Sequence, residues 1–317
     1  MLRYALRRLP SALLVLLVAS VLVFGVLRLA PGDPAVVLAG PDASPATVAE
    51  VRASLGLDSP LPAQYWTWLT GVLTGDLGTS FILGAPIATL IGHGLGNTLE
   101  LTVAALLLAV AGGGAAGFAL GTARRPAVRG LVGGAVNLAL AVPPYATGVL
   151  LVLVFAVALP VLPASGHESL LADPVIGAQY LLLPAVCLAL PTGAVLARFL
   201  ATALRRAEQE DYVRTGHGKG LPRRHLLARH VLPGALPPVV TVLGIQTGQL
   251  LGGAIVVEAV YAWPGLGQLL LQAVLGRDYL LVQDLLLFAV AVFVVLQTLT
   301  DLVQARLDPR VRMGGAG

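Results

Sequence analysis

Long apolar runs separated by short polar segments dominate this chain. A transmembrane helix needs about 20 mostly apolar residues. Six stretches meet that requirement: Leu9–Ala30, Leu95–Gly121, Leu131–Leu159, Tyr180–Leu204, Leu236–Val257 and Leu280–Leu302. None of them shows the ten-residue alternation of a membrane β-barrel strand. The pattern predicts an all-α polytopic membrane protein with six transmembrane helices, the first of which (9–30) is an uncleaved anchor.

Basic residues fall mainly on one side of these predicted spans. Arginines and lysines cluster before the first span, between the second and third, between the fourth and fifth, and after the sixth. Short loops rich in Lys and Arg stay in the cytoplasm. We therefore predict that both termini are cytoplasmic and that residues 31–93 form a large first extracytoplasmic loop.

The composition agrees with a membrane protein. Hydrophobic residues make up 57% of the 317 residues and charged residues 11%, whereas soluble domains contain about 25% charged residues. These values exclude an ordinary soluble enzyme. The single cysteine, Cys187, excludes an internal disulfide. The net charge of +4 comes from the arginines that set the orientation, and without interleaved base-stacking aromatic residues it does not indicate a nucleic-acid partner.

The large outer loop contains two predicted helical pieces. Thr47 and Glu50 have the spacing of a capping box and predict a short helix that runs to about Leu55. The amphipathic stretch 62–73 follows, and its aromatic residues are Tyr65, Trp66 and Trp68. Because aromatic side chains favour the membrane interface, we expect this stretch to lie on the outer leaflet. An aromatic cage for a substrate is the alternative.

The inner segment Arg205–Pro233 is too long for a simple connection between helices. Its glycines at 216, 218 and 220 and the proline at 222 predict two short helices separated by a bend. Two interpretations are equally supported: a protein-docking surface, and a solvated basic loop beside anionic lipid. The spacing of its histidines suits no metal-ligand pair, so we expect solvated side chains at His217, His225 and His230.

Glycines at four-residue spacing occur in two of the predicted spans. This spacing stacks them on one helix face, where another helix can approach closely. The glycines predicted to pack in this way are Gly113, Gly117 and Gly121 in the second span and Gly244, Gly248 and Gly252 in the fifth. The pattern indicates a tightly packed bundle or dimer.

Polar residues are few in the fifth and sixth spans. Gln246 and Gln249 are three residues apart and therefore on one helix face. An interhelical hydrogen bond and a substrate path both explain them. Glu258 and Asp284 lie near the predicted outer ends of their spans, where we expect hydrated, ionised carboxylates. A proton relay is the alternative.

Motifs of catalytic and nucleotide sites are absent from the sequence. There is no H-E-x-x-H zinc motif and no G-x-S-x-G nucleophile motif. A phosphate-binding Walker motif fails twice around Gly218-Lys219, because Val213 stands where glycine is needed and Gly220 where Ser or Thr is needed. We expect no catalytic residue, no metal site and no cofactor bound by this chain.

Seven motifs occur in order along nearly the whole chain. They are LRLAPGDPA (27–35), GDLGTSF (75–81), NTLEL (97–101), PASGHES (163–169), EDYVRTGHGKGL (210–221), GGAIVVEAVYAWPGLG (252–267) and RLDPRVR (306–312). Together they resemble the permease subunits of dipeptide, oligopeptide and nickel ABC importers, in the branch with a large first outer loop.

The cytoplasmic motif of such permeases is the most specific part of the resemblance. Its glycine and Leu-Pro pair match Gly220 and Leu232-Pro233 at the right spacing, although its Glu-Ala-Ala positions hold Arg-Thr-Gly here. The resemblance implies a helix that couples the permease to a cytoplasmic ATPase. The residues implied for this role are Glu210, Asp211, Tyr212, Arg214, Thr215, Gly216, Lys219, Gly220, Leu221, Leu232 and Pro233.

The resemblance also implies an architecture and partners. The expected fold is that of a type I ABC importer permease in the bacterial cytoplasmic (inner) membrane. It would comprise an anchor with its outer loop (1–93) and a five-helix core (94–317) containing the segment 205–233. The expected partners are a homologous second permease, two ATPase domains that hold ATP and Mg, an extracytoplasmic solute-binding protein and the lipid bilayer. The expected solutes are di- and oligopeptides, and a nickel chelate or a haem-like solute is the alternative within the same family. An ion-driven secondary transporter is the alternative of another class.

Overall fold

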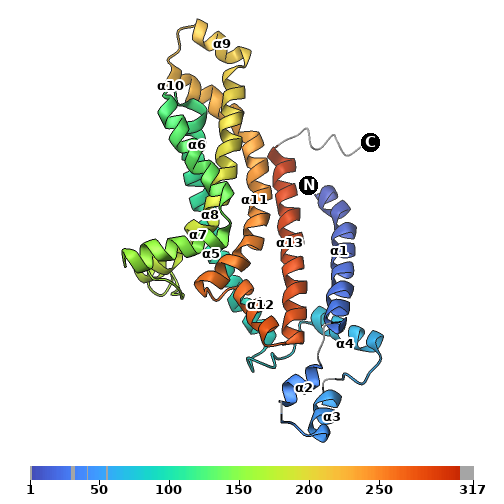
Figure 1. Cartoon of the computed structure of the whole chain (residues 1–317). Helices are drawn as coiled ribbons and strands as arrows, with labels where there is room; N and C mark the ends of the chain where they lie inside the picture. The colour runs from blue at the N-terminus through green and yellow to red at the C-terminus, as the bar shows by residue number, and fades with distance from the viewer. Residues whose placement is uncertain (1, 30–32, 41, 55, 308–317) are drawn as a thin grey trace. The chain divides into compact units, whose positions relative to one another are not determined.

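A computed structural model describes residues 2–29, 33–40, 42–54 and 56–307, and these residues are mostly helical (Figure 1). The all-α prediction is confirmed. In chain order the helices are α1 (Leu2–Leu29), α2 (Pro34–Ala39), α3 (Pro45–Ser54), α4 (Leu61–Thr74), α5 (Ile87–Thr122), α6 (Pro126–Ala141), α7 (Pro144–Leu151), the π-helix η1 (Val152–Ala158), α8 (Pro174–Glu208), α9 (Asp211–Gly218), α10 (Arg223–Leu226), the π-helix η2 (Leu227–Val231), α11 (Leu232–Tyr261), α12 (Leu266–Leu275) and α13 (Tyr279–Leu307).

The chain forms two compact units. The first comprises residues up to 97 together with 264–298, and the second comprises residues 98–263 with the end of α13. Residues 264–298 group with the N-terminal part, and the division predicted at residues 93 and 94 stays a prediction. Their apolar side chains share a core with the start of α5 that includes Ile87, Ile91, Leu269, Leu281 and Leu285.

In the second unit, α8 is the central helix. It packs against α6, α7 and α11. Its first turn is capped by Asp173, whose carboxylate accepts hydrogen bonds from the backbone of Val175 and Ile176 at 2.9 and 3.0 Å. The largest core of this unit joins α5, α8 and α11 through residues that include Leu101, Leu188, Leu250 and Trp263.

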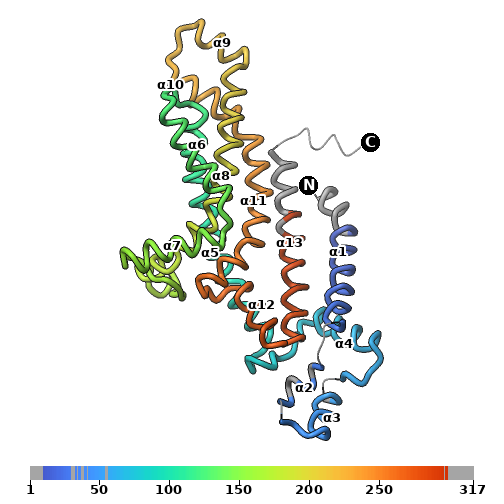
Figure 2. Tube along the Cα trace, viewed as in Figure 1, coloured from blue at the N-terminus to red at the C-terminus, as the bar shows by residue number. Residues whose placement is uncertain are grey.

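The third predicted span, Leu131–Leu159, is wrong as a single helix. The chain ends α6 at Ala141, bends through 111° and continues as α7 and η1, as Figure 2 shows. The break falls at Pro143-Pro144. Proline lacks a backbone donor and disfavours helical geometry in the residue before it, so two in succession end α6 and start α7.

In the first unit, α4 packs on α1 through aromatic rings. The ring of the buried Phe24 lies 5.4 Å from that of Tyr65 and 6.1 Å from that of Trp68. The hydroxyl groups of Ser20 and Tyr65 are 2.8 Å apart. Tyr65 and Trp68 are therefore half-buried residues that pack on α1, and the position of this helix on the outer leaflet stays a prediction. Trp66, which is 62% exposed, keeps a surface position.

The short helix predicted to open at Thr47 is present but starts earlier than expected. α3 begins at Pro45, and the Ser44 hydroxyl accepts a hydrogen bond from the backbone of Thr47 at 3.2 Å. The capping box predicted at Thr47 is wrong because Ser44 already satisfies the free donors one turn before it. An ion pair between Arg52 and Asp33 joins α3 to the residue that caps α2.

Within the described residues, four helical stretches are long and apolar enough to cross a membrane, and the bent pair α6 and α7–η1 makes five. The part of α13 from Tyr279 to Val295 is a shorter apolar helix. The count of six and the cytoplasmic position of the termini therefore stay predictions. Most of the closing motif RLDPRVR, including Arg310 and Arg312, lies outside the described residues.

Candidate docking segment and membrane interior

The segment Arg205–Pro233 contains two short helices separated by a bend, as predicted. α9 starts after a break that follows α8, and α10 leads through η2 directly into α11. Gly220 turns the chain between α9 and α10 with a φ of +76°, a left-handed conformation that favours glycine. Pro222 is the cap of α10.

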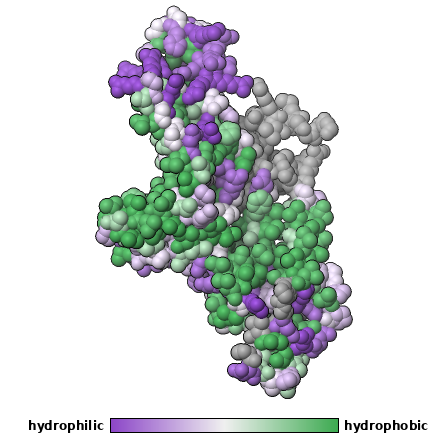
Figure 3. Space-filling model, in the orientation of Figure 1, coloured by the Kyte–Doolittle hydropathy of each residue, from purple (hydrophilic) through white to green (hydrophobic). Residues whose placement is uncertain are grey.

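The helix α9 has one buried face and one exposed face. Val213 and Gly216 are buried, and Val213 shares a core cluster with Leu204 and Val231. Gly216 permits the close approach of α10, because a Cβ there would lie 2.5 Å from Cδ2 of Leu226. The exposed residues of the predicted coupling set are Glu210, Asp211, Tyr212, Arg214, Thr215, Lys219, Gly220 and Pro233. Figure 3 shows a mainly hydrophilic surface over α9 and α10.

The other residues predicted for coupling lie before α9, between α9 and α10, and at the start of α11. Glu210 is exposed and precedes α9, and with Tyr212 it lines a cavity of about 330 Å³. Leu221 is half-buried and donates its backbone N–H to the carbonyl of Gly216 at 3.2 Å. Leu232 and Pro233 form the first turn of α11, where a missing backbone donor is tolerated.

Two arginines attach the segment to the end of α5. Arg223 donates to the backbone carbonyl of Thr122 at 3.0 Å and lies 3.3 Å from the Glu208 carboxylate. Arg205 donates to the carbonyl of Leu120 at 3.0 Å. The last carbonyls of a helix have no partner within the helix, and cationic groups stabilise them. The sequence does not predict these contacts, because the basic residues of the segment indicate only its orientation and a docking or lipid-facing surface.

The histidines of the segment are only partly solvated. His217 is exposed, and its Nδ1 lies 3.1 Å from the carbonyl of Val213. His225 and His230 are half-buried, with ring centroids 5.9 Å apart. The prediction of solvated side chains is wrong for these two, because α10 packs on α9 and η2 packs on α8. Neither here nor elsewhere in the described ranges do three or more His, Cys, Asp or Glu residues form a group that could hold a metal ion.

The helices α5 and α8 approach each other closely along a line of glycines. A Cβ on Gly113 would lie 2.4 Å from the carbonyl oxygen of Gly193, and one on Gly117 would lie 2.8 Å from that of Ala197. A Cβ on Gly121 would meet the side chain of Leu204 at 2.9 Å. These distances are shorter than van der Waals contact, so only glycine fits without separating the helices.

The glycines of α11 behave differently. Gly252 is exposed, and no atom of the described chain lies within 4 Å of a Cβ placed there. The adjacent Gly253 faces α8 instead, where a Cβ would lie 3.1 Å from Leu188. Within this chain Gly252 therefore does not mark a helix contact. The other two predicted packing positions are half-buried: Gly244 and Gly248.

The two glutamines of α11 occupy different environments. Gln246 is 8% exposed, whereas Gln249 is exposed. They are three residues apart on the helix, but the core of the second unit covers only the first of them. The substrate path and the interhelical hydrogen bond stay predictions for this pair, and Gln249 is the more exposed of the two side chains.

Two carboxylates of the apolar helices are buried. Glu258, in the second unit, is 0% exposed and accepts a hydrogen bond from the Thr98 hydroxyl at 2.6 Å. Asp284, in the first unit, is 3% exposed and accepts one from the Trp68 indole N–H at 2.7 Å. The expectation of hydrated carboxylates is wrong at both positions, because each acid finds a donor on a neighbouring helix.

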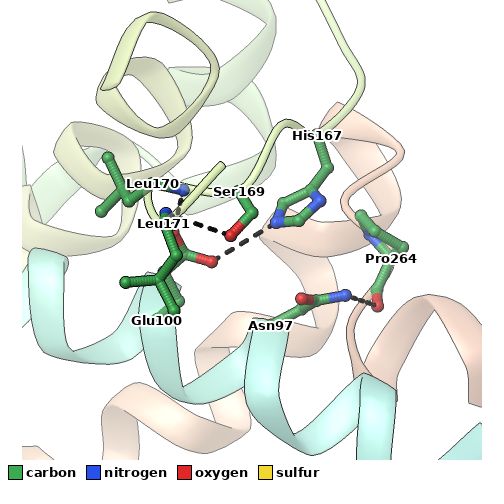
Figure 4. A network of polar contacts seen from close by, with 7 residues as sticks. All are labelled: Asn97, Glu100, His167, Ser169, Leu170, Leu171 and Pro264. Carbon is green, nitrogen blue, oxygen red and sulfur yellow. Dashed lines mark hydrogen bonds and ion pairs between the residues drawn. The ribbon is translucent and has the colours of Figure 1, made fainter. Parts of the chain in front are cut away.

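A polar network in the second unit joins the chain after η1 to α5 (Figure 4). One carboxylate oxygen of Glu100 accepts from the backbone N–H of Leu170 at 3.3 Å, and the other lies 3.4 Å from Nε2 of His167. The His167 ring meets the buried Trp263 ring edge-on, with centroids 4.5 Å apart. The sequence does not predict this network, although Glu100, His167 and Trp263 stand in the motifs NTLEL, PASGHES and GGAIVVEAVYAWPGLG.

Two protein families match this sequence. The family described as "Binding-protein-dependent transport system inner membrane component" matches residues 113–313, and the family of its N-terminal part matches residues 1–102. Three similar proteins are glutathione transport system permease proteins GsiC. They come from Salmonella paratyphi A (39% identical), Pectobacterium atrosepticum (40%) and Escherichia coli K12 (37%), and each alignment covers 98% of this chain and 99% of the relative.

Two solved structures share the fold over much of the chain. One is described as an amino acid ABC transporter with histidines, and it is 16% identical, with a TM-score of 0.53 over 69% of this chain and 94% of that one. The other is an inward-facing MetNI methionine ABC transporter, 20% identical, with a TM-score of 0.55 over 70% and 98%. At these identities the likeness shows the fold alone, which is that of a type I ABC importer permease.

Proposed function

From the premise that this chain belongs to the family of binding-protein-dependent transport system inner membrane components, we propose that it carries di- and oligopeptides across the bacterial inner membrane. The family makes it the pore-forming subunit of an ABC importer. The ATP and Mg are then held by partner ATPase domains, and an extracytoplasmic binding protein delivers the solute to this chain and a second permease.

The observation that carries the proposal is the construction of the docking segment. One face of α9 is buried on α10 through Gly216, and the other presents Asp211, Arg214 and Lys219 to solvent. A short amphipathic helix with an anchored apolar side and a free charged side suits a groove on a partner protein. We propose that this face binds a cytoplasmic ATPase.

The same segment has the contacts needed to transmit motion. Arg223 bonds both the last residue of α5 and Glu208 near the end of α8, and Arg205 adds a second bond to the end of α5. A partner can shift a conformational equilibrium only through contacts that differ between two states. An ATPase that moves α9 would therefore displace the ends of α5 and α8 together.

The proposed solute class rests on the relatives and on α11. The relatives are named as glutathione transport permeases, and glutathione is a short peptide derivative. The exposed amide of Gln249 offers both a donor and an acceptor, as a peptide backbone requires, and we propose that it contacts the solute. Gln246 would then hold its neighbour helices in place from the buried side.

Three variants separate docking from transmission. Arg214→Glu combined with Lys219→Glu should abolish co-purification with the ATPase while membrane insertion persists. Arg223→Gln should keep co-purification but lower solute-stimulated ATP hydrolysis at least about tenfold, since one hydrogen bond to a charged group is worth about 1.5–3 kcal/mol. Arg224→Gln changes an exposed neighbouring arginine and serves as the control. Full co-purification of the double variant would refute the docking surface.

Uptake by the reconstituted importer tests the solute class. Labelled dipeptide, tripeptide and glutathione should be transported, and a nickel–histidine chelate should not compete with them. Gln249→Ala should change the relative rates among the peptides, while Gln246→Ala should lower all rates equally. Transport of the nickel chelate alone would overturn the peptide assignment.

A further inference from the structure

The first unit contains a cavity that the proposed transport cycle does not use. It has a volume of about 440 Å³ and lies between α4, the start of α5 and α13. Figure 1 draws α4 beside the start of α13. The cavity walls are apolar except at Asp284, and they include Val72, Ile91, Leu95, Leu287 and Phe288.

Only one of the two carboxylate oxygens of Asp284 has a hydrogen-bond donor within the described chain. Its Oδ1 accepts the hydrogen bond from Trp68 at 2.7 Å. Its Oδ2 is buried and has no hydrogen-bond partner among the described residues. A buried carboxylate oxygen without a donor is costly. No basic side chain of the described residues lines the cavity, so a molecule in the cavity can supply the missing donor.

The shape of the cavity defines the rest of that ligand. Its walls follow α13 from Asp284 to Ala291, a rise of about 10 Å along a helix. Apolar walls of this length suit an aliphatic chain, and the carboxylate at one end suits a positively charged donor. We propose that the cavity binds a primary ammonium group attached to an apolar chain, with Asp284 accepting from the ammonium.

This ligand chemistry has two sources in a bacterial membrane. One is a phospholipid with an amine headgroup, and the other is a small soluble amine with an apolar body. The proposal does not depend on the proposed function, since every residue that carries it lies in the first unit and none belongs to the docking segment.

The indole of Trp68 provides a direct reporter, because its N–H is bonded to the same carboxylate. The measurement uses the purified full chain with Trp66→Phe, which removes the exposed indole. Trp263 remains as a constant signal, since it is fully buried in the second unit. Titration with n-octylamine should shift the emission of Trp68 to saturation, at a concentration about tenfold below that required for n-octanol.

Matched variants test the carboxylate and the cavity separately. Asp284→Asn keeps the shape and should reduce the preference for the amine to less than about twofold. Gly92→Leu should abolish the response to both probes, because Gly92 lines the cavity and no described atom lies within 4 Å of a Cβ there. Gly96→Leu, one turn further along α5 and also without neighbours within 4 Å, lies outside the cavity and should respond like the parent.

Thermal unfolding of each variant distinguishes a lost site from a lost fold. Equal affinities for octylamine and octanol in the parent, or an unchanged amine preference in a folded Asp284→Asn variant, would overturn the proposal. Lipid nanodiscs then identify the source. Emission already shifted in phosphatidylethanolamine but not in phosphatidylcholine assigns the site to a lipid headgroup. Octylamine binding with equal strength in both lipids assigns it to a soluble amine.

Discussion

Replacing Gly113 by alanine should separate α5 from α8 and destabilise the second unit. The added Cβ would lie 2.4 Å from the carbonyl oxygen and 2.7 Å from Cα of Gly193. Carbon atoms pack best at about 3.5–4.0 Å. Both obstructing atoms belong to the backbone, so no side-chain rotamer relieves the overlap, and the helices must move apart by about 1 Å.

The size of the effect follows from two opposing contributions. Overpacking of a close-packed site costs about 1–3 kcal/mol. Alanine favours a helix over glycine by about 1 kcal/mol, which offsets part of this cost. The net loss of unfolding free energy expected for Gly113→Ala is therefore at most about 2 kcal/mol, and it lies in the upper part of that range because both obstructing atoms belong to the backbone. Gly193→Ala should cost less, because its nearest contact would be 3.3 Å.

Thermal unfolding of the detergent-purified protein measures this series. Gly114→Ala is the matched control, since it is adjacent in the sequence and no described atom lies within 4 Å of a Cβ there. It should be as stable as the parent or more stable. The expected order of stability is Gly114→Ala, then Gly193→Ala, then Gly113→Ala. Equal melting of the Gly113 and Gly114 variants would refute the argument from backbone contact.

Three further substitutions address other contacts. Thr98→Val removes the hydroxyl that donates to Glu258 and should lower the unfolding free energy by about 1–3 kcal/mol; Thr98→Ser should restore most of it, and thermal unfolding compares the two. Gly216→Ala places a Cβ 2.5 Å from Leu226, so ATPase co-purification should fall; Leu226→Ala in the same chain should restore it if the clash is the cause. Asp173→Ala removes the cap of α8 and should cost about 1 kcal/mol in thermal unfolding, whereas Asp173→Ser keeps a capping oxygen and should cost less.

The features that the sequence predicts correctly are those set by residues close together in the chain. Hydrophobic runs predict the long helices, and the spacing of Gly220 and Pro222 predicts the bend between α9 and α10. The break at Pro143-Pro144 is also encoded locally, although the length of the apolar run alone predicts one continuous span. The earlier start of α3 is of the same kind, because Ser44 is as good a cap as Thr47.

The features that the sequence does not predict depend on partners far along the chain. Glu258 is buried because Thr98 of α5 supplies a donor, and Asp284 is buried because Trp68 of α4 does so. A hydropathy profile scores each residue without its neighbours in space. It therefore predicts that both acids lie hydrated at the outer membrane surface. Gln249 is a third example. Helical spacing places it close to Gln246, but it does not predict that neighbouring helices bury Gln246 and leave Gln249 exposed.

The close contact between α5 and α8 at Gly113, Gly117 and Gly121 lies next to the hydrogen bonds by which Arg205 and Arg223 hold the end of α5. This proximity explains how the docking segment would move both helices. The closest approach of α5 and α8 runs from Gly113 to Gly121, and the bonds from Arg205 and Arg223 begin immediately beside it, at Leu120 and Thr122. Backbone in direct contact with backbone leaves no flexible side chains to absorb a displacement. A push on the segment should therefore move α5 and α8 as one body, and the variants that widen this line should weaken coupling even where docking is intact.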